Sequence, residues 1–129
     1  MRFLLDTHVL LWLLAGSVRL PEDIRDRLAD PRHALFVSAA SGWEIAIKLR
    51  LGKLNITPAV HQWLPDELDA AGILELPVTL AHTLAVEQLP RHHGDPFDRL
   101  LIAQANIEQL MLVSADQVFG HDEVRLLRI

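Results

Sequence analysis

The chain has 129 residues, half of them apolar, which is enough for one compact domain with its own core. It contains no cysteine, which excludes disulfides and thiolate metal sites and agrees with a cytoplasmic location. The formal net charge of −5 comes from 17 acidic and 12 basic residues, and this is the wrong sign for binding nucleic acid through a basic surface. The excess acids are either ordinary solvated surface or a carboxylate cluster that meets nucleic acid only after taking up cations.

The opening segment, residues 1–16, has one arginine and an apolar run, as a signal peptide does. Asp6 and His8 interrupt that run, and the run is too short to cross a bilayer. We therefore predict a buried strand followed by a helix, and no membrane segment.

Short apolar runs bounded by polar or turn residues are typical of buried strands. Five such runs are present: Phe3–Leu5, Leu35–Val37, Ile73–Leu76, Met111–Val113 and Val124–Leu127.

Four segments between these runs have helical spacing and a start signal. Pro21 begins one helix, Ser41 precedes the helix over residues 43–53, and Thr57 with Pro58 precedes residues 59–72, in which Pro65 should kink or divide the helix. Asp95 and Pro96 open the strongest helix, over residues 97–109. Strands alternating with helices predict an α/β domain with a mainly parallel sheet of four to five strands covered on both faces. No repeat or linker interrupts residues 1–129, so we expect a single domain.

Four acidic residues should meet at one edge of this sheet. Asp6 and Asp116 follow the first and a late strand, while Glu44 and Asp98 lie in the first turn of their predicted helices. Right-handed crossovers place all strand-to-helix turns of a parallel sheet at the same edge, where α/β folds bind ligands. Clustered carboxylates repel one another, and a hard divalent cation such as Mg²⁺ or Mn²⁺ relieves that repulsion. Such a cation activates water and stabilises charge on a phosphoryl oxygen, so a phosphodiester suits the site.

Structural roles compete with this interpretation. Asp95 before Pro96 is a typical N-cap, Asp98 fits its capping partner, and Glu44 with Lys48 fits a surface ion pair. Taken singly, Glu44 and Asp98 are more often structural. Asp6 favours function, because a carboxylate directly after a buried strand is costly without a partner.

The sequence also resembles a known family. The segments LLDTHVLLW (residues 4–12), SGWEIAIKLRLGKL (41–54), HGDPFDRLLIAQA (93–105) and LVSADQVF (112–119) are similar to those of PIN-domain ribonucleases, and within them to VapC-type toxins of bacterial toxin–antitoxin pairs. The segments follow the family's order and spacing over almost the whole chain. The resemblance implies a PIN-like three-layer α/β/α fold and an endoribonuclease. It also implies a homodimer and a VapB-like antitoxin whose peptide blocks the acidic cleft.

Carried over residue by residue, the family's Mg²⁺/Mn²⁺ site falls on Asp6, Glu44, Asp98 and Asp116. Asp116 matches the least constant of the four, so the resemblance implies an indirect role for it. Beside the acids, Thr7, Ser114 and Asp95 are candidates to orient water, phosphate or the metal ligands.

The basic residues near the acids have two interpretations. Arg99 and His93 could contact RNA, or they could be an ion-pair partner and a solvated loop residue. The seven histidines show no His-x-x-x-His pair, so a zinc site is disfavoured.

Two other functions compete with the ribonuclease. A receiver-like signalling module also binds Mg²⁺ with clustered acids, but Asp6 has no acidic neighbour and no lysine follows Met111–Val113. A catalytically inactive PIN module that binds RNA or a partner is disfavoured because all four acids are present.

Overall fold

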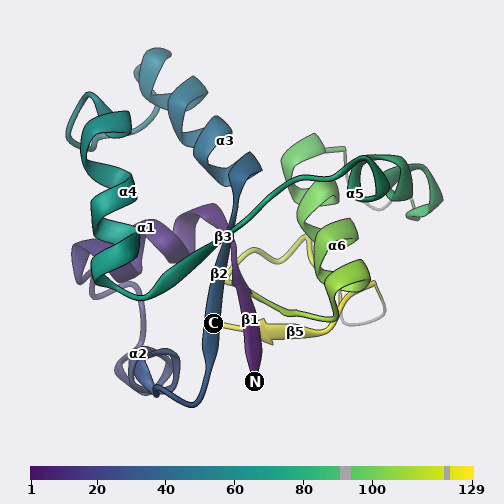
Figure 1. The fold of residues 1–129 in the computed structure, drawn as a ribbon, viewed down its shortest axis with the longest axis horizontal. Coiled ribbons are helices and arrows are strands. Elements are labelled where there is room, and N and C mark those ends of the chain that lie inside the picture. The colour runs from purple at the N-terminus through teal and green to yellow at the C-terminus, as the bar shows by residue number, and fades with distance from the viewer. Residues whose placement is uncertain (91–93, 121–122) are drawn as a thin grey trace.

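A five-stranded sheet with only parallel pairings forms the centre of the molecule (Figure 1). The structure, a computed structural model, describes residues 1–90, 94–120 and 123–129. The strands are β1 (Arg2–Leu5), β2 (Ala34–Ser38), β3 (Ile73–Leu76), β4 (Met111–Ser114) and β5 (Leu126–Arg128). Their order, β3-β2-β1-β4-β5, puts the first strand in the middle. All five strands lie within two residues of the predicted runs.

Helices cover both faces of this sheet. They are α1 (Thr7–Ala15), α2 (Glu22–Ala29), α3 (Ala39–Arg50), α4 (Val60–Ala70), α5 (Leu80–Ala85), the 3₁₀ turn η1 (Val86–Gln88) and α6 (Pro96–Glu108). Figure 1 shows α1, α2 and α4 on one side of the sheet and α5 and α6 on the other. None of the helices in the described ranges is both long and apolar enough to cross a membrane.

The pleat of β1 divides the core into two parts. Phe3 and Leu5 pack with Val9 and Leu10 of α1 on one face, whereas Leu4 packs on the other face with α6. Alternate residues of a strand point to opposite faces, so a run of three buried residues serves two apolar clusters. The expected three-layer α/β/α architecture is confirmed.

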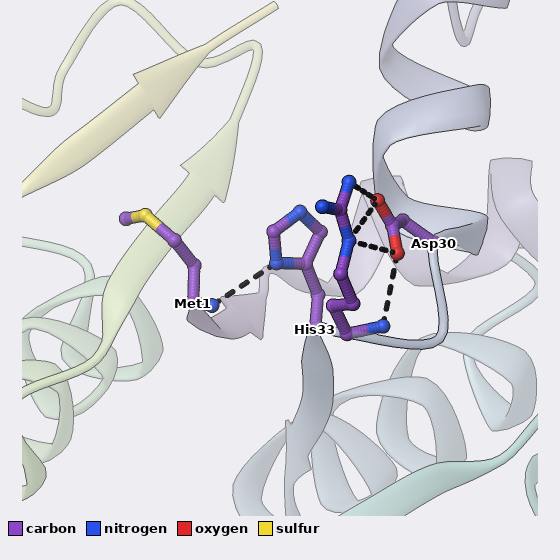
Figure 2. Close-up of polar contacts among 4 residues, drawn as sticks. Met1, Asp30 and His33 are labelled. Carbon is purple, nitrogen blue, oxygen red and sulfur yellow. Dashed lines mark hydrogen bonds and ion pairs between the residues drawn. The ribbon is translucent and has the colours of Figure 1, made fainter.

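The start of the chain is joined to the segment before β2 (Figure 2). The amine of Met1 lies 3.0 Å from Nδ1 of His33, and the backbone N–H of Ala34 donates to the carbonyl of Met1 over 3.0 Å. Beside them an exposed ion pair joins Arg32 to Asp30, which lowers the pKa of that carboxyl. The bond between Ala34 and Met1 lies next to the pairing of Arg2 with Ala34, at the end of the sheet opposite the acids.

The predicted starts of two helices are wrong, and one helix was not predicted. Helix α3 begins at Ala39 with Ser38 as its N-cap, so Ser41 lies inside the helix and Glu44 lies in its second turn. Helix α4 contains Pro65 without being divided, and its N-cap position is Ala59 in a left-handed conformation with no side-chain cap. Helix α5 was not predicted.

Candidate active site

A small polar cavity of about 90 Å³ lies beyond the carboxyl ends of β1 and β4. Loops and helices that follow the strands supply its wall, as the parallel topology predicts. The lining residues are Asp6, Thr7, His8, Glu44, Lys48, Asp95, Asp98, Leu101 and Asp116. All four predicted metal-site acids therefore border one cavity, together with Asp95 and Thr7.

Asp6 is buried and is held by two hydrogen-bond donors. Its Oδ1 accepts from the backbone N–H of Val9 at 2.8 Å, which makes Asp6 the N-cap of α1. Its Oδ2 accepts a very short hydrogen bond from the hydroxyl of Ser114. Burial nevertheless raises the pKa of Asp6 above its ordinary value, because both donors only partly replace the lost water. The unpaired carboxylate expected from the sequence thus has partners, although it remains a buried acid.

Glu44 is also buried, and both of its oxygens have partners. Oε1 lies 2.5 Å from the hydroxyl of Thr7, and Oε2 lies 2.7 Å from Nζ of Lys48. The Thr7 hydroxyl is also 3.0 Å from Oγ of Ser41. Its single proton goes to the carboxylate, so Ser41 must donate to Thr7. The predicted pair of Glu44 with Lys48 is confirmed, but Glu44 lies inside the wall of the cavity rather than on the surface.

Asp98 has a strongly raised pKa. Burial raises its pKa from 3.8 to about 7, and the negative charges around it add to this effect. In order of decreasing effect, these charges are Asp95, Asp116, Glu44 and Asp6. The pKa of Asp98 is therefore raised by the negative charge of every other acid of the cavity.

Asp95 fills its predicted N-cap position. Its Oδ1 accepts from the backbone N–H groups of Phe97 and Asp98, at 2.8 Å and 3.1 Å. This leaves Oδ2 of Asp95 for another partner at the cavity.

Asp116 is exposed and lies at the mouth of the cavity. Its backbone N–H donates to Oγ of Ser114 over 3.0 Å, so one serine links Asp116 to the buried Asp6. Its Oδ1 accepts from the backbone N–H of Val118 at 3.0 Å. Asp116 is thus held by a turn of the chain, at a site with direct access to solvent.

The cavity offers oxygen donors of the kind that Mg²⁺ and Mn²⁺ prefer. Among residues 1–90, 94–120 and 123–129, we find no group of three or more histidine, aspartate or glutamate side chains close enough together to hold a metal ion. The donor chemistry fits a hard divalent cation, whereas the present side-chain spacing is wider than a coordinated ion needs. Lys48 supplies positive charge at this site. Its ammonium has a raised pKa, mainly because of its hydrogen bond to Glu44 and also because of Asp95 and Asp98.

Of the two predicted RNA contacts, Arg99 is not among the described residues that line the cavity. The guanidinium of Arg99 donates to the carbonyls of Pro90 and Val86, both at 3.0 Å. His93 lies outside the described residues. Sequence reasoning missed His8, which is exposed at the cavity two residues after Asp6. Its place in the first turn of a helix that Asp6 caps was the available signal.

Comparisons with known proteins give one family match and one similar sequence. The sequence model of one family, the PIN domain, matches residues 3–122. Ribonuclease VapC16 of Mycobacterium tuberculosis is 41% identical over 61 residues, a stretch that spans 47% of this chain and 43% of that protein.

Solved structures with this fold include two DNA-bound complexes. They are VapBC2 from Rickettsia felis, with a TM-score of 0.72, 14% identity and coverage of 99% of this chain and 98% of the other, and VapBC from Salmonella typhimurium, with a TM-score of 0.72, 15% identity and the same coverage. FitAcB from Neisseria gonorrhoeae is similar at a TM-score of 0.58 and 20% identity, over 98% of this chain and 96% of the other. At these identities the structures show a common fold. Because the family's sequence model covers residues 3–122, the chain belongs to the PIN domain family.

Proposed function

We propose that this protein is a Mg²⁺- or Mn²⁺-dependent endoribonuclease and the toxin of a toxin–antitoxin pair. The observation that carries the proposal is the gathering of five acids around one cavity, where burial and the neighbouring charges raise the pKa of Asp98 to about 7. Repelling carboxylates at the ligand-binding edge of a parallel sheet are a functional arrangement, since they cost stability unless a cation joins them. The 41% sequence identity with Ribonuclease VapC16, over 43% of the length of that protein, supports the same activity.

The acids divide into three that would hold the cation and one that would act at its border. Asp6, Glu44 and Asp98 lie in the wall, and they would close in on a bound ion. Asp116, exposed at the mouth, would act through water. When bound, the cation supplies Lewis acidity to a water molecule and to the phosphodiester.

The hydroxyl groups of the cavity would keep the carboxylates in position. Thr7 holds one oxygen of Glu44, and Ser114 holds one oxygen of Asp6. The second oxygen of Glu44 is held by Lys48, and that of Asp6 by the backbone N–H of Val9. Lys48 would move from Glu44 toward a phosphate once a cation neutralises the glutamate.

Two protein partners follow from the same proposal. A homodimer would cover the exposed apolar side chains of α5, Leu80 and Leu84. A VapB-like antitoxin would block the cavity with a basic segment, because the cavity wall carries five carboxylates. Structural neighbours described as VapBC complexes favour such a partner.

The test is cleavage of RNA in the presence of Mg²⁺ or Mn²⁺, with and without chelator. The Asp98→Asn variant keeps the shape of the side chain and removes one charge, and it should lower the cleavage rate by at least about 100-fold. Asp69→Asn is a matched control, since Asp69 is an exposed acid of α4 outside the cavity.

Cleavage that persists in chelator, or that Asp98→Asn leaves unchanged, would contradict the metal mechanism. If Mn²⁺ raises the melting temperature of the wild type but no RNA is cut, the chain is a binding module.

A further inference from the structure

An exposed tryptophan directly precedes one of the acids of the cavity in the sequence. Trp43 is 65% exposed, and its ring centroid lies 5.4 Å from that of Phe97, with the ring planes at 69°. Each ring belongs to the residue directly before an acid of the cavity: Trp43 precedes Glu44 on α3, and Phe97 precedes Asp98 on α6. The aromatic pair therefore joins the two helices that bring these acids together.

The other two tryptophans have contacts that account for their positions. The indole N–H of Trp63 donates to the carbonyl of Thr57 over 3.0 Å, and its ring packs with the apolar core. Trp12 is half-buried and packs against the same core. Trp43 differs from both, because its contact with Phe97 leaves most of its surface in water.

Packing alone does not account for Trp43. An edge-to-face pair of aromatic rings is worth about 0.5–1.5 kcal/mol beyond area burial, and a buried pair would also gain from leaving water. Here Phe97 is half-buried and contacts the indole, while 65% of Trp43 stays exposed, one residue along the chain from an acid of the cavity. A solvent-facing ring of this kind is suited to stacking on another flat group.

We propose that Trp43 stacks on a nucleobase of the RNA strand whose phosphodiester lies at the acid cavity, with Phe97 holding the indole in place. This inference depends on the proposed ribonuclease function. Unpaired bases of RNA are bound mainly by stacking on aromatic side chains, and stacking needs no positive charge. A chain with a net charge of −5 gains in this way an attraction for RNA that its own acids do not oppose.

The proposal makes Trp43 a positioning residue for substrate, not a catalytic one. It predicts that Trp43 contributes to the binding of a base and leaves the chemical step at the carboxylates unchanged. The competing occupant is a second copy of the chain, which would cover Trp43 in a dimer.

The experiment compares wild type with Trp43→Leu, Trp43→Phe and the control Leu51→Ala. Leu51 is 61% exposed at the far end of α3, so the control removes a similarly exposed apolar group about 12 Å along the same helix. Each protein is assayed with Mn²⁺ on a short single-stranded oligoribonucleotide and on the same oligomers carrying single abasic positions. Quenching of tryptophan emission by the oligoribonucleotide is recorded with Ca²⁺ in place of Mn²⁺.

We expect Trp43→Leu to raise KM on the order of 10-fold with little change in kcat. Trp43→Phe should recover part of that loss, and Leu51→Ala should behave as wild type. The wild-type protein should show quenching that Trp43→Leu lacks, and at one abasic position the difference between the two proteins should disappear.

An unchanged KM and unchanged quenching in Trp43→Leu, while the wild type cleaves RNA, would overturn this inference and leave the ribonuclease proposal standing. Conversion of a wild-type dimer to a monomer by Trp43→Leu, with the same loss on intact and abasic RNA, would assign the ring to the second copy and overturn it as well. If the wild type neither binds nor cleaves RNA, both proposals fail together.

Discussion

Asp98 and Asp6 show how one cavity treats two aspartates differently. Asp6 is the more deeply buried, yet a backbone N–H and the Ser114 hydroxyl donate to it. Asp98 is half-buried, and four neighbouring carboxylates act on it. The charge of the first carboxylate is therefore partly stabilised by the fold itself, whereas the charge of the second is opposed by burial and by its neighbours.

The pKa of Asp98 predicts how stability depends on pH without metal. The folded protein keeps a proton on Asp98 up to about pH 7, whereas the unfolded chain releases it near the ordinary value of 3.8. Because the native state binds the extra proton, the contribution of Asp98 to the free energy of unfolding falls as pH rises from about 4 to about 7. Asp98→Asn should remove this fall, so the variant should unfold at a higher temperature than wild type at pH 8 in chelator.

The measurement is thermal unfolding in chelator from pH 4 to pH 8, with Asp69→Asn as the control. The gap between Asp98→Asn and wild type should narrow toward pH 4, because the side chain of Asp98 in the folded wild type is neutral there, as the amide of the variant is. A gap that does not depend on pH would show that Asp98 is not strained by its neighbours.

At the scale of the element, helix α6 sets the position of Asp98. Asp95 caps the helix, Pro96 fixes its first turn, and the side chain of Asp98 then projects from the first turn into the cavity. The N-cap of α6 and two acids of the cavity thus lie in one short segment. A substitution at Asp95 can therefore change the stability of the helix, the charge of the cavity or both.

Two substitutions at Asp95 distinguish its role as the N-cap of α6 from a role in the proposed metal site. Asp95→Ala removes the acceptor for Phe97 and Asp98 and should destabilise the protein by about 0.5–2 kcal/mol. Asp95→Asn keeps an N-cap acceptor, so stability should stay close to that of wild type. If Asp95 acts only as a cap, the rise in melting temperature caused by Mn²⁺ will be the same in Asp95→Asn and wild type. A smaller rise would assign its second oxygen to the metal site.

For the whole molecule, the exposed apolar surface of α5 bears on assembly. Leu80 and Leu84 are 73% and 64% exposed and lie four residues apart on one helix. Figure 1 shows α5 at the edge of the molecule, beyond α6. Paired apolar side chains of this kind are suited to a two-fold contact, in which the same surface serves both subunits.

We expect Leu84→Glu to shift the protein from dimer to monomer, because a dimer contact would bring the new charge out of water. Sedimentation velocity over a range of protein concentrations measures the change. Leu51→Glu, which adds the same charge on α3, should leave the assembly unaltered. A wild type that is monomeric at all concentrations would contradict the proposed homodimer.

Strand positions and the shared edge of the acids could be predicted because they follow from apolar runs and parallel topology. Leu4 shows the principle, since it is buried on the opposite face of β1 from its neighbours. The start of α3 could not be predicted, because Ser38 and Ser41 are both good capping residues and only the end of β2 decides between them. The six-residue helix α5 is too short for a periodic pattern. Its N-terminus depends on contacts of His82, whose Nδ1 accepts from the backbone N–H of Thr79 at 3.0 Å.

Most hydrogen-bond partners of the site residues could not be predicted from the sequence, for a different reason. The predicted pair of Glu44 with Lys48 rests on local spacing, and it is present. The contacts of Ser114 with Asp6 and of Thr7 with Glu44 join residues 108 and 37 positions apart, which local patterns do not encode. Arg99 illustrates the same limit, since its bonds to the carbonyls of Pro90 and Val86 depend on how the chain folds before α6.

The central place of β1 has a consequence for synthesis on the ribosome. One neighbour, β2, is made soon after it, but the other, β4, is made only after β2, β3 and the helices that follow them. The Ser114 hydroxyl that binds Asp6 arrives with β4, and so does the turn that carries Asp116. Domains fold as their parts emerge, and pairings between distant residues form late. A nascent chain therefore carries Asp6 long before it can complete its acid cavity, which needs β4 and the turn after it.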